Sequence, residues 1–150
     1  MSATISAPAA TQRGIDPRGP QFTAAITSVV LIVILLVPTT AATVLAGVQA
    51  VLFAIGATLG VQRTPHAALF KAAVRPRLSA PTELEDPAPP RFAQAVGLAF
   101  TGVAFIAYLA GATVVGQVAI GLALVAALLN AIFRFCLGCE MYLLIKRFAP

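Results

Sequence analysis

The sequence predicts an all-α membrane protein with four transmembrane helices arranged as two parallel-repeat hairpins. Two stretches carry no charged residue: residues 19–62, which number 44, and residues 92–133, which number 42. A hydrocarbon core of about 30 Å is crossed by roughly 20 helical residues, so each stretch is long enough for two crossings. The composition agrees, because 59% of the residues are apolar and 10% are charged. Such a chain cannot be a water-soluble globular protein.

The N-terminal segment, residues 1–18, is polar and rich in small residues, and it includes Arg13, Asp16 and Arg18. It contains no apolar run like that of a cleavable signal peptide. We therefore expect it to be a disordered cytoplasmic tail. The first transmembrane hairpin follows over residues 19–62, and Pro38 breaks it near the middle because proline interrupts a helix interior.

The central loop, residues 63–91, combines two kinds of sequence. Thr64 and Pro65 stand where a helix starts, and the following residues place apolar side chains on one side and Lys71 and Arg75 on another. This pattern predicts a short basic interfacial helix. The remainder is rich in proline and acidic residues, so we expect an extended cytoplasmic connector.

The second transmembrane hairpin is predicted over residues 92–135, with its turn at Gly111. The chain closes with residues 136–150, which contain a Cys-x-x-Cys motif and a basic C-terminal segment. Alanines recur every fourth residue in the second and fourth predicted helices, a spacing that lets helices approach closely in lipid, although an alanine-rich chain also produces such rows by chance. The rows are Ala42, Ala46, Ala50 and Ala54, and Ala119, Ala123, Ala127 and Ala131.

The distribution of basic residues predicts the orientation. With four crossings, all ten Lys and Arg residues fall on one side of the membrane. Because excess Lys and Arg mark the cytoplasmic face, we place both termini in the cytoplasm and the protein in the bacterial inner membrane. The net charge of +5 then suits anionic lipid headgroups rather than nucleic acid.

An internal repeat links the two hairpins. The pattern Asp-Pro-x-x-Pro-x-Phe begins at Asp16 and recurs at Asp86, an offset of 70 residues. Each copy stands where a hairpin enters the membrane, and its Asp-Pro pair can cap the first helix. Duplication of one hairpin would relate the halves by a pseudo-twofold axis along the membrane normal.

The candidate chemistry lies in the two cysteines, Cys136 and Cys139. Arg134 would favour the thiolate form and Glu140 would oppose it, so both are candidate modulators. Three interpretations stay open: a dithiol for redox or sulfur transfer, a metal site completed by His66 or another chain, and inert packing at a helix end. Cytoplasmic placement argues against a permanent structural disulfide.

Other site types have no counterpart in the sequence. We find no glycine loop for nucleotides, no paired carboxylates, no serine–histidine arrangement and no RNA-binding aromatic motif. The charge-free stretches also contain no Asp, Glu, Lys, Arg or His, which weighs against a proton-coupled pump. We therefore expect no cofactor and no nucleic-acid partner, and whether the chain is an enzyme stays open.

Several motifs in order resemble one family. The chain is similar to the family known as domain of unknown function 4395, bacterial membrane proteins prominent in actinobacteria, from about Ile15 to Arg147. The resemblance implies four transmembrane helices, supplies no activity, and implies a setting in sulfur metabolism with thioredoxin-like or sulfurtransferase proteins. The residues that carry it are Asp16-Pro17-Arg18-Gly19-Pro20-x-Phe22, Glu85-Asp86-Pro87-x-Pro89-Pro90-Arg91-Phe92, Leu129-Asn130, and Cys136-x-Gly138-Cys139-Glu140-x-Tyr142.

Together these features favour one functional hypothesis. A Cys-x-x-Cys at the cytoplasmic end of the fourth helix would handle thiols or sulfur for a partner, with Cys139 as the more accessible attacking thiol. One alternative is a noncatalytic subunit or scaffold in a larger membrane complex or homo-oligomer. Another is a channel for a small sulfur-containing solute.

Overall fold

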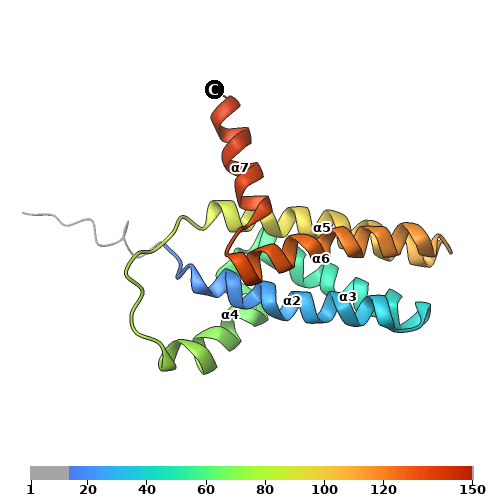
Figure 1. Cartoon of the computed structure of the whole chain (residues 1–150), viewed down its shortest axis with the longest axis horizontal. Helices are drawn as coiled ribbons and strands as arrows, with labels where there is room; N and C mark the ends of the chain where they lie inside the picture. The colour runs from blue at the N-terminus through green and yellow to red at the C-terminus, as the bar shows by residue number, and fades with distance from the viewer. Residues whose placement is uncertain (1–13, 150) are drawn as a thin grey trace, which may run out of the picture.

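A computed structural model describes residues 14–149 and confirms the predicted all-α class (Figure 1). Four helices are long and apolar enough to cross a membrane. They are α2 (Arg18–Leu36), α3 (Thr39–Thr58), α5 (Ala88–Leu109) and α6 (Thr113–Phe133). The described part of the chain contains one isolated antiparallel bridge and no longer strand.

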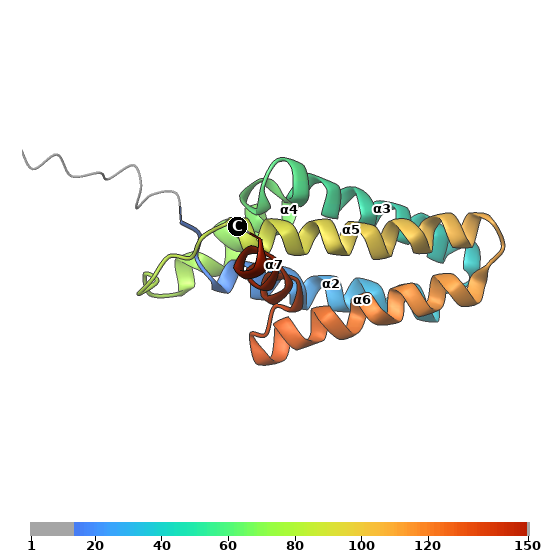
Figure 2. The same cartoon turned by 90° about the horizontal axis from the view of Figure 1, so that it is seen from above.

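The four long helices form a bundle in which each helix has two neighbours (Figures 1 and 2). Besides the pairing within each hairpin, α3 packs along α5 and α2 packs along α6. The core is made of apolar side chains and small residues from all four helices. Leu31 of α2 and Ile120 of α6 are completely buried at its centre, beside Ala46 of α3 and Ala104 of α5.

Both predicted hairpin turns are present. Helix α2 ends at Leu36, Val37 is extended, and α3 begins directly after Pro38. At the second turn Gly111 has a φ of 80°, a conformation that residues with a Cβ rarely adopt. The two turns lie together at one end of the bundle, opposite the central loop (Figure 1).

Small residues face the interior mainly in the half of the bundle near these turns. Ala42, Ala46, Ala119 and Ala123 are buried, whereas the later members of both alanine rows are half-buried. Glycine also allows α6 to approach α5 closely here, because a Cβ at Gly116 would lie 2.6 Å from the ring of Tyr108. The alanine rows thus pack tightly near the turns and more loosely toward the opposite end.

The residues just before α2 are held against the connector. Residues 1–13 lie outside the described part, but Ile15 is buried and exchanges two backbone hydrogen bonds of 2.9 Å with Glu85. Asp16 is buried too, accepts a hydrogen bond from the Arg18 amide at 3.0 Å and pairs with the Arg18 guanidinium. Residues 14–18 are held because the connector supplies the backbone partner that a free tail would lack.

A short helical segment follows α3. Thr64 caps α4 (Pro65–Leu69) by accepting a hydrogen bond from the Ala67 amide at 3.2 Å. The helix continues as η2 (Phe70–Val74) and η3 (Arg75–Arg77), after the short turn η1 (Val61–Arg63). Phe70 is buried against Phe22 of α2, with ring centroids 5.6 Å apart. Beyond it, the connector is free of helix until α5.

A further helix, α7 (Leu137–Phe148), follows α6 and was not predicted. It projects away from the side of the bundle rather than running along it (Figures 1 and 2). Its apolar side chains fall on one face at helical spacing, and Lys146 and Arg147 lie in its last turn. This distribution is typical of a helix that lies in the membrane surface.

Candidate functional site: a disulfide at the mouth of an apolar cavity

The cysteines do not belong to the fourth helix, which corrects the sequence prediction. Helix α6 ends at Phe133, and Arg134 adopts a left-handed conformation with a φ of 56°. The Phe135 amide then donates to the Leu129 carbonyl at 3.2 Å, which closes the helix end as in a Schellman turn. The chain changes direction here, so the Cys-x-x-Cys opens α7 instead of closing α6.

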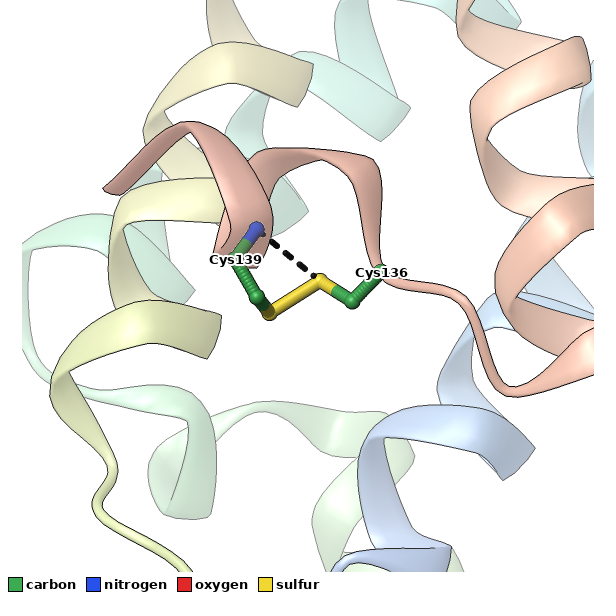
Figure 3. The surroundings of a disulfide bond; sticks show 2 residues. All are labelled: Cys136 and Cys139. Atoms are coloured by element: carbon green, nitrogen blue, oxygen red, sulfur yellow. Dashed lines mark hydrogen bonds between the residues drawn. A yellow bond between two sulfur atoms is a disulfide. The ribbon is translucent and has the colours of Figure 1, made fainter. Parts of the chain in front are cut away.

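Cys136 is the N-cap of α7 and is joined to Cys139 by a disulfide (Figure 3). The Cys136 Sγ accepts a hydrogen bond from the Cys139 amide at 3.2 Å, and the two Cα atoms are 5.1 Å apart. Both residues are half-buried. A sulfur at this position faces the unpaired amides and the positive end of the helix dipole, which stabilise negative charge.

Gly138, between the cysteines, is a contact point with α5. A Cβ at this position would lie 2.7 Å from the Cα of Ala93, so no larger residue fits without moving the backbone. One turn later, the ring of Tyr142 packs against that of Phe92 with centroids 5.8 Å apart. These contacts hold the first turn of α7, and with it the disulfide, on the first turns of α5.

The predicted modulators lie near the motif without pairing to each other. Arg134 and Glu140 are both exposed, and the ion pair found among residues 14–149 is Arg18–Asp16. Glu140 stands in the first turn of α7, where a carboxylate interacts favourably with the helix dipole. The same negative charge opposes a thiolate on Cys136, so the helix terminus and Glu140 act in opposite directions on that sulfur.

His66 does not join the cysteines. It is buried in α4, and burial lowers the pKa of its imidazole because the charged form loses hydration. Within the described residues, no three side chains of His, Cys, Asp or Glu are grouped closely enough to hold a metal ion. The metal site suggested for Cys136, Cys139 and His66 is therefore not formed.

The disulfide borders a cavity of about 320 Å³. The cavity lies among α2, α5, α6 and the first turn of α7, with Phe53 of α3 also in its wall, in the half of the bundle away from the hairpin turns. Its walls are mainly apolar, and Cys136, Gly138 and Met141 line it from α7. Leu122 and Val125 of α6, which are 53% and 57% exposed, also border it, so the cavity reaches the lipid-facing surface.

Thr27 is a polar residue of this cavity that sequence reasoning missed. Its side chain is 3% exposed, and its Oγ1 has no hydrogen-bond partner among the described residues. Buried Ser28 and Thr101 instead donate to the carbonyl four residues earlier, Ser28 to Ala24 at 2.8 Å and Thr101 to Gly97 at 2.8 Å. The Tyr108 hydroxyl and the Gln49 side-chain oxygen are also unpaired among the described residues, but neither residue lines this cavity. Gln94 and Asn130 add two amides to the lining. No sequence signal distinguishes Thr27 from those other hydroxyls, because the cavity that it lines is formed by residues of several helices.

Comparison with known proteins gives a family and no activity. A family model described as "Domain of unknown function (DUF4395)" matches residues 15–147. No curated protein and no solved structure matches the chain.

Proposed function

We propose that this chain, which belongs to the DUF4395 family, exchanges thiols and disulfides with a partner protein through Cys136 and Cys139. The observation that carries the proposal is the placement of the pair. One sulfur caps a helix N-terminus, both residues are half-buried, and the motif is held on the bundle by Gly138. Reactive cysteines sit at helix N-termini with partial access to solvent, whereas a purely structural cysteine is fully buried and inert.

The proposal gives the two sulfurs different roles. When a partner thiolate attacks the disulfide, the sulfur with the lower thiol pKa leaves faster. Cys136 has the helix N-terminus and the Cys139 amide to stabilise its negative charge. Attack therefore falls on the Sγ of Cys139, which bonds to the partner, while Cys136 leaves as a thiolate. A second partner thiol then breaks the mixed disulfide and releases an oxidised partner and a reduced Cys136–Cys139 pair.

The proposal includes the setting of the reaction. The motif lies at the end of the bundle that holds α4 and the basic central loop (Figure 1). The positive-inside rule assigns that end to the cytoplasm of a bacterial inner membrane, with both termini inside. The partner is then a cytoplasmic thioredoxin-like or sulfurtransferase protein, the class that the family resemblance implies.

The two hairpins belong to the proposal as parallel repeats. Ile15 and Glu85, which form the antiparallel bridge, are separated by the same 70 residues as the repeated motifs. Asp86 accepts from the Ala88 amide at 2.9 Å, as Asp16 does from the Arg18 amide. A twofold axis between the hairpins accounts for both observations, since such an axis pairs equivalent residues with each other.

Mixed-disulfide trapping in intact cells tests the exchange reaction. Cys136→Ser leaves Cys139 without its internal partner, so we expect a reducible adduct with a cellular protein, identified by mass spectrometry. Cys139→Ser should accumulate less adduct, because Cys136 is shielded in the cavity wall. The double variant is the matched control and should give none while inserting into the membrane normally.

The scaffold alternative makes a different prediction for the same cells. A Cβ added at Gly102 of α5 or at Gly121 of α6 would have no atom within 4 Å, which leaves room for a helix of another chain. A scaffold would copurify with other membrane subunits at fixed stoichiometry, and replacement of both cysteines would not change that stoichiometry. Absence of any adduct in both single variants, together with such copurification, would favour the scaffold.

A further inference from the structure

We propose that the cavity beside Cys136 binds the ring of a quinone dissolved in the bilayer, and that the quinone is the redox counterpart of the cysteine pair. This inference rests on the proposed thiol–disulfide function. It identifies where the two electrons taken from the partner go, which the exchange reaction alone leaves open.

The walls and size of the cavity select an uncharged, lipid-soluble ligand. None of the described residues that line it is charged, so neither a phosphate headgroup nor a nucleotide would find a counter-charge among them. Its volume of about 320 Å³ is at the lower end of the range for small-molecule pockets. That space accommodates one substituted ring and the beginning of a tail. The border at Leu122 and Val125 then gives the tail an exit to the lipid.

The polar groups select a ligand that accepts hydrogen bonds. The buried Thr27 Oγ1 has no partner in the described structure, and leaving such a group unpaired costs free energy. A quinone carbonyl would accept its hydrogen. Gln94 and Asn130, which also line the cavity, carry amide groups that can donate hydrogen bonds. An acyl chain of a lipid would fill the same space and leave the Thr27 hydroxyl unpaired.

The position of Cys136 makes electron transfer to the ring direct. Its half-buried side chain lines the cavity, while Cys139 is not among the lining residues. Cys139 can therefore engage a protein partner while Cys136 faces the ring.

The reaction balances as a transfer of two electrons. After the partner has reduced the pair, the Cys136 thiolate adds to a ring carbon of the quinone and forms a C–S bond. The Cys139 thiolate then attacks the Cys136 Sγ, so the S–S bond forms and the C–S bond breaks. The bonding pair stays on the ring, which takes up two protons and leaves as hydroquinone. The dithiol is oxidised to the disulfide, and the quinone is reduced.

Two measurements on the full-length protein in nanodiscs test the proposal. The first uses an azido derivative of ubiquinone-1, with the labelled peptides mapped by mass spectrometry, on a variant carrying both Cys136→Ser and Cys139→Ser. We expect labelling in the cavity walls. Thr27→Val should raise the concentration of unlabelled ubiquinone-1 needed to compete with the label by between about twofold and tenfold, which corresponds to the loss of one hydrogen bond. Thr101→Val is the matched control, because the Thr101 hydroxyl already donates a hydrogen bond to the Gly97 carbonyl of its own helix.

The second measurement follows reoxidation of the reduced wild-type pair by ubiquinone-1 without oxygen, read by alkylation and gel shift. Ala126→Phe fills the cavity and should slow reoxidation on the order of tenfold, as expected for a ligand excluded by overpacking. Ala99→Phe changes an exposed position of α5 outside the cavity and should have no effect.

The two measurements separate failure of this inference from failure of the proposed function. Labelling spread evenly over the lipid-facing helices, or equal reoxidation in Ala126→Phe and Ala99→Phe, would overturn the quinone site even if a mixed disulfide with a partner is trapped. Cavity labelling without any trapped partner or any reoxidation would instead overturn the redox role of the cysteines, and the inference with it.

Discussion

At the scale of single residues, Gly138 is the residue that ties the cysteines to the bundle. Gly138 lies between the two cysteines in the sequence. A glycine is needed there because the backbone approaches Ala93 of α5 closely, and not because the residue has a special backbone conformation. Since only the absence of a Cβ allows that contact, the identity of the residue controls where the disulfide sits.

Gly138→Ala should therefore lower the stability of the folded protein by about 1–3 kcal/mol, the usual cost of overpacking. Thermal unfolding in detergent measures the loss, and the rate of mixed-disulfide formation should fall as well because α7 is displaced. Gly102→Ala is the control, because a Cβ there meets no atom within 4 Å. Equal behaviour of the two variants would show that α7 does not depend on this contact.

Asp16 should make stability depend on pH. Its hydrogen bonds from Arg18 hold the pKa of the carboxyl below its usual value, so the ionised form is favoured in the folded state. The resulting stabilisation is complete above the unfolded-state pKa of about 3.9 and is lost as the pH falls through the lower folded-state pKa.

Asp16→Asn should therefore lower the melting temperature at pH 7. The melting temperature of the variant should then fall less on acidification than that of the wild-type protein. Asp86→Asn offers the matched comparison, since Asp86 is exposed and caps α5 without an ion pair within the described residues. Identical melting curves for the two variants across this pH range would contradict a special role for Asp16.

At the scale of elements, the alanine rows have two different environments. Ala46 of α3 is fully buried in the core, whereas Ala123 of α6 is buried but also lines the cavity. A leucine at Ala46 has no space to enter, while one at Ala123 can extend into the cavity.

We therefore expect Ala46→Leu to cost about 1–3 kcal/mol of stability and Ala123→Leu to cost less. Unfolding in detergent again gives the comparison, with Ala41→Leu on the exposed side of α3 as the control. A larger loss at Ala123 than at Ala46 would mean that the cavity is closed in the folded protein.

At the scale of the whole molecule, the distribution of charge predicts the direction of the bundle in the membrane. Cysteine labelling from each side tests it, in a background with Cys136 and Cys139 replaced by serine. Ala80→Cys should react from the cytoplasm, and Thr39→Cys or Thr113→Cys from outside, because all ten basic residues fall on one side. Labelling of Ala80→Cys from outside would reverse the orientation and move the disulfide to an oxidising compartment.

The sequence by itself determined the four spans, their turns at Pro38 and Gly111, the helix starting after Thr64, and the two cysteines as the place to look for chemistry. These features are local: the cost of burying a charge and the effect of proline or glycine act within a window of one helix. The amphipathic spacing of α7, from Leu137 to Phe148, is a local feature of the same kind. It was not predicted, because the segment was interpreted from its basic residues alone.

Only the tertiary structure decided how the cysteines are presented. The seating of Gly138 on Ala93 and the place of Thr27 in the cavity wall depend on residues far apart in the chain. The cavity is lined by residues of α2, α3, α5, α6 and α7, and no single segment encodes that combination. Packing is a property of pairs of helices, so a motif can be found in one segment while its surroundings are supplied by the others.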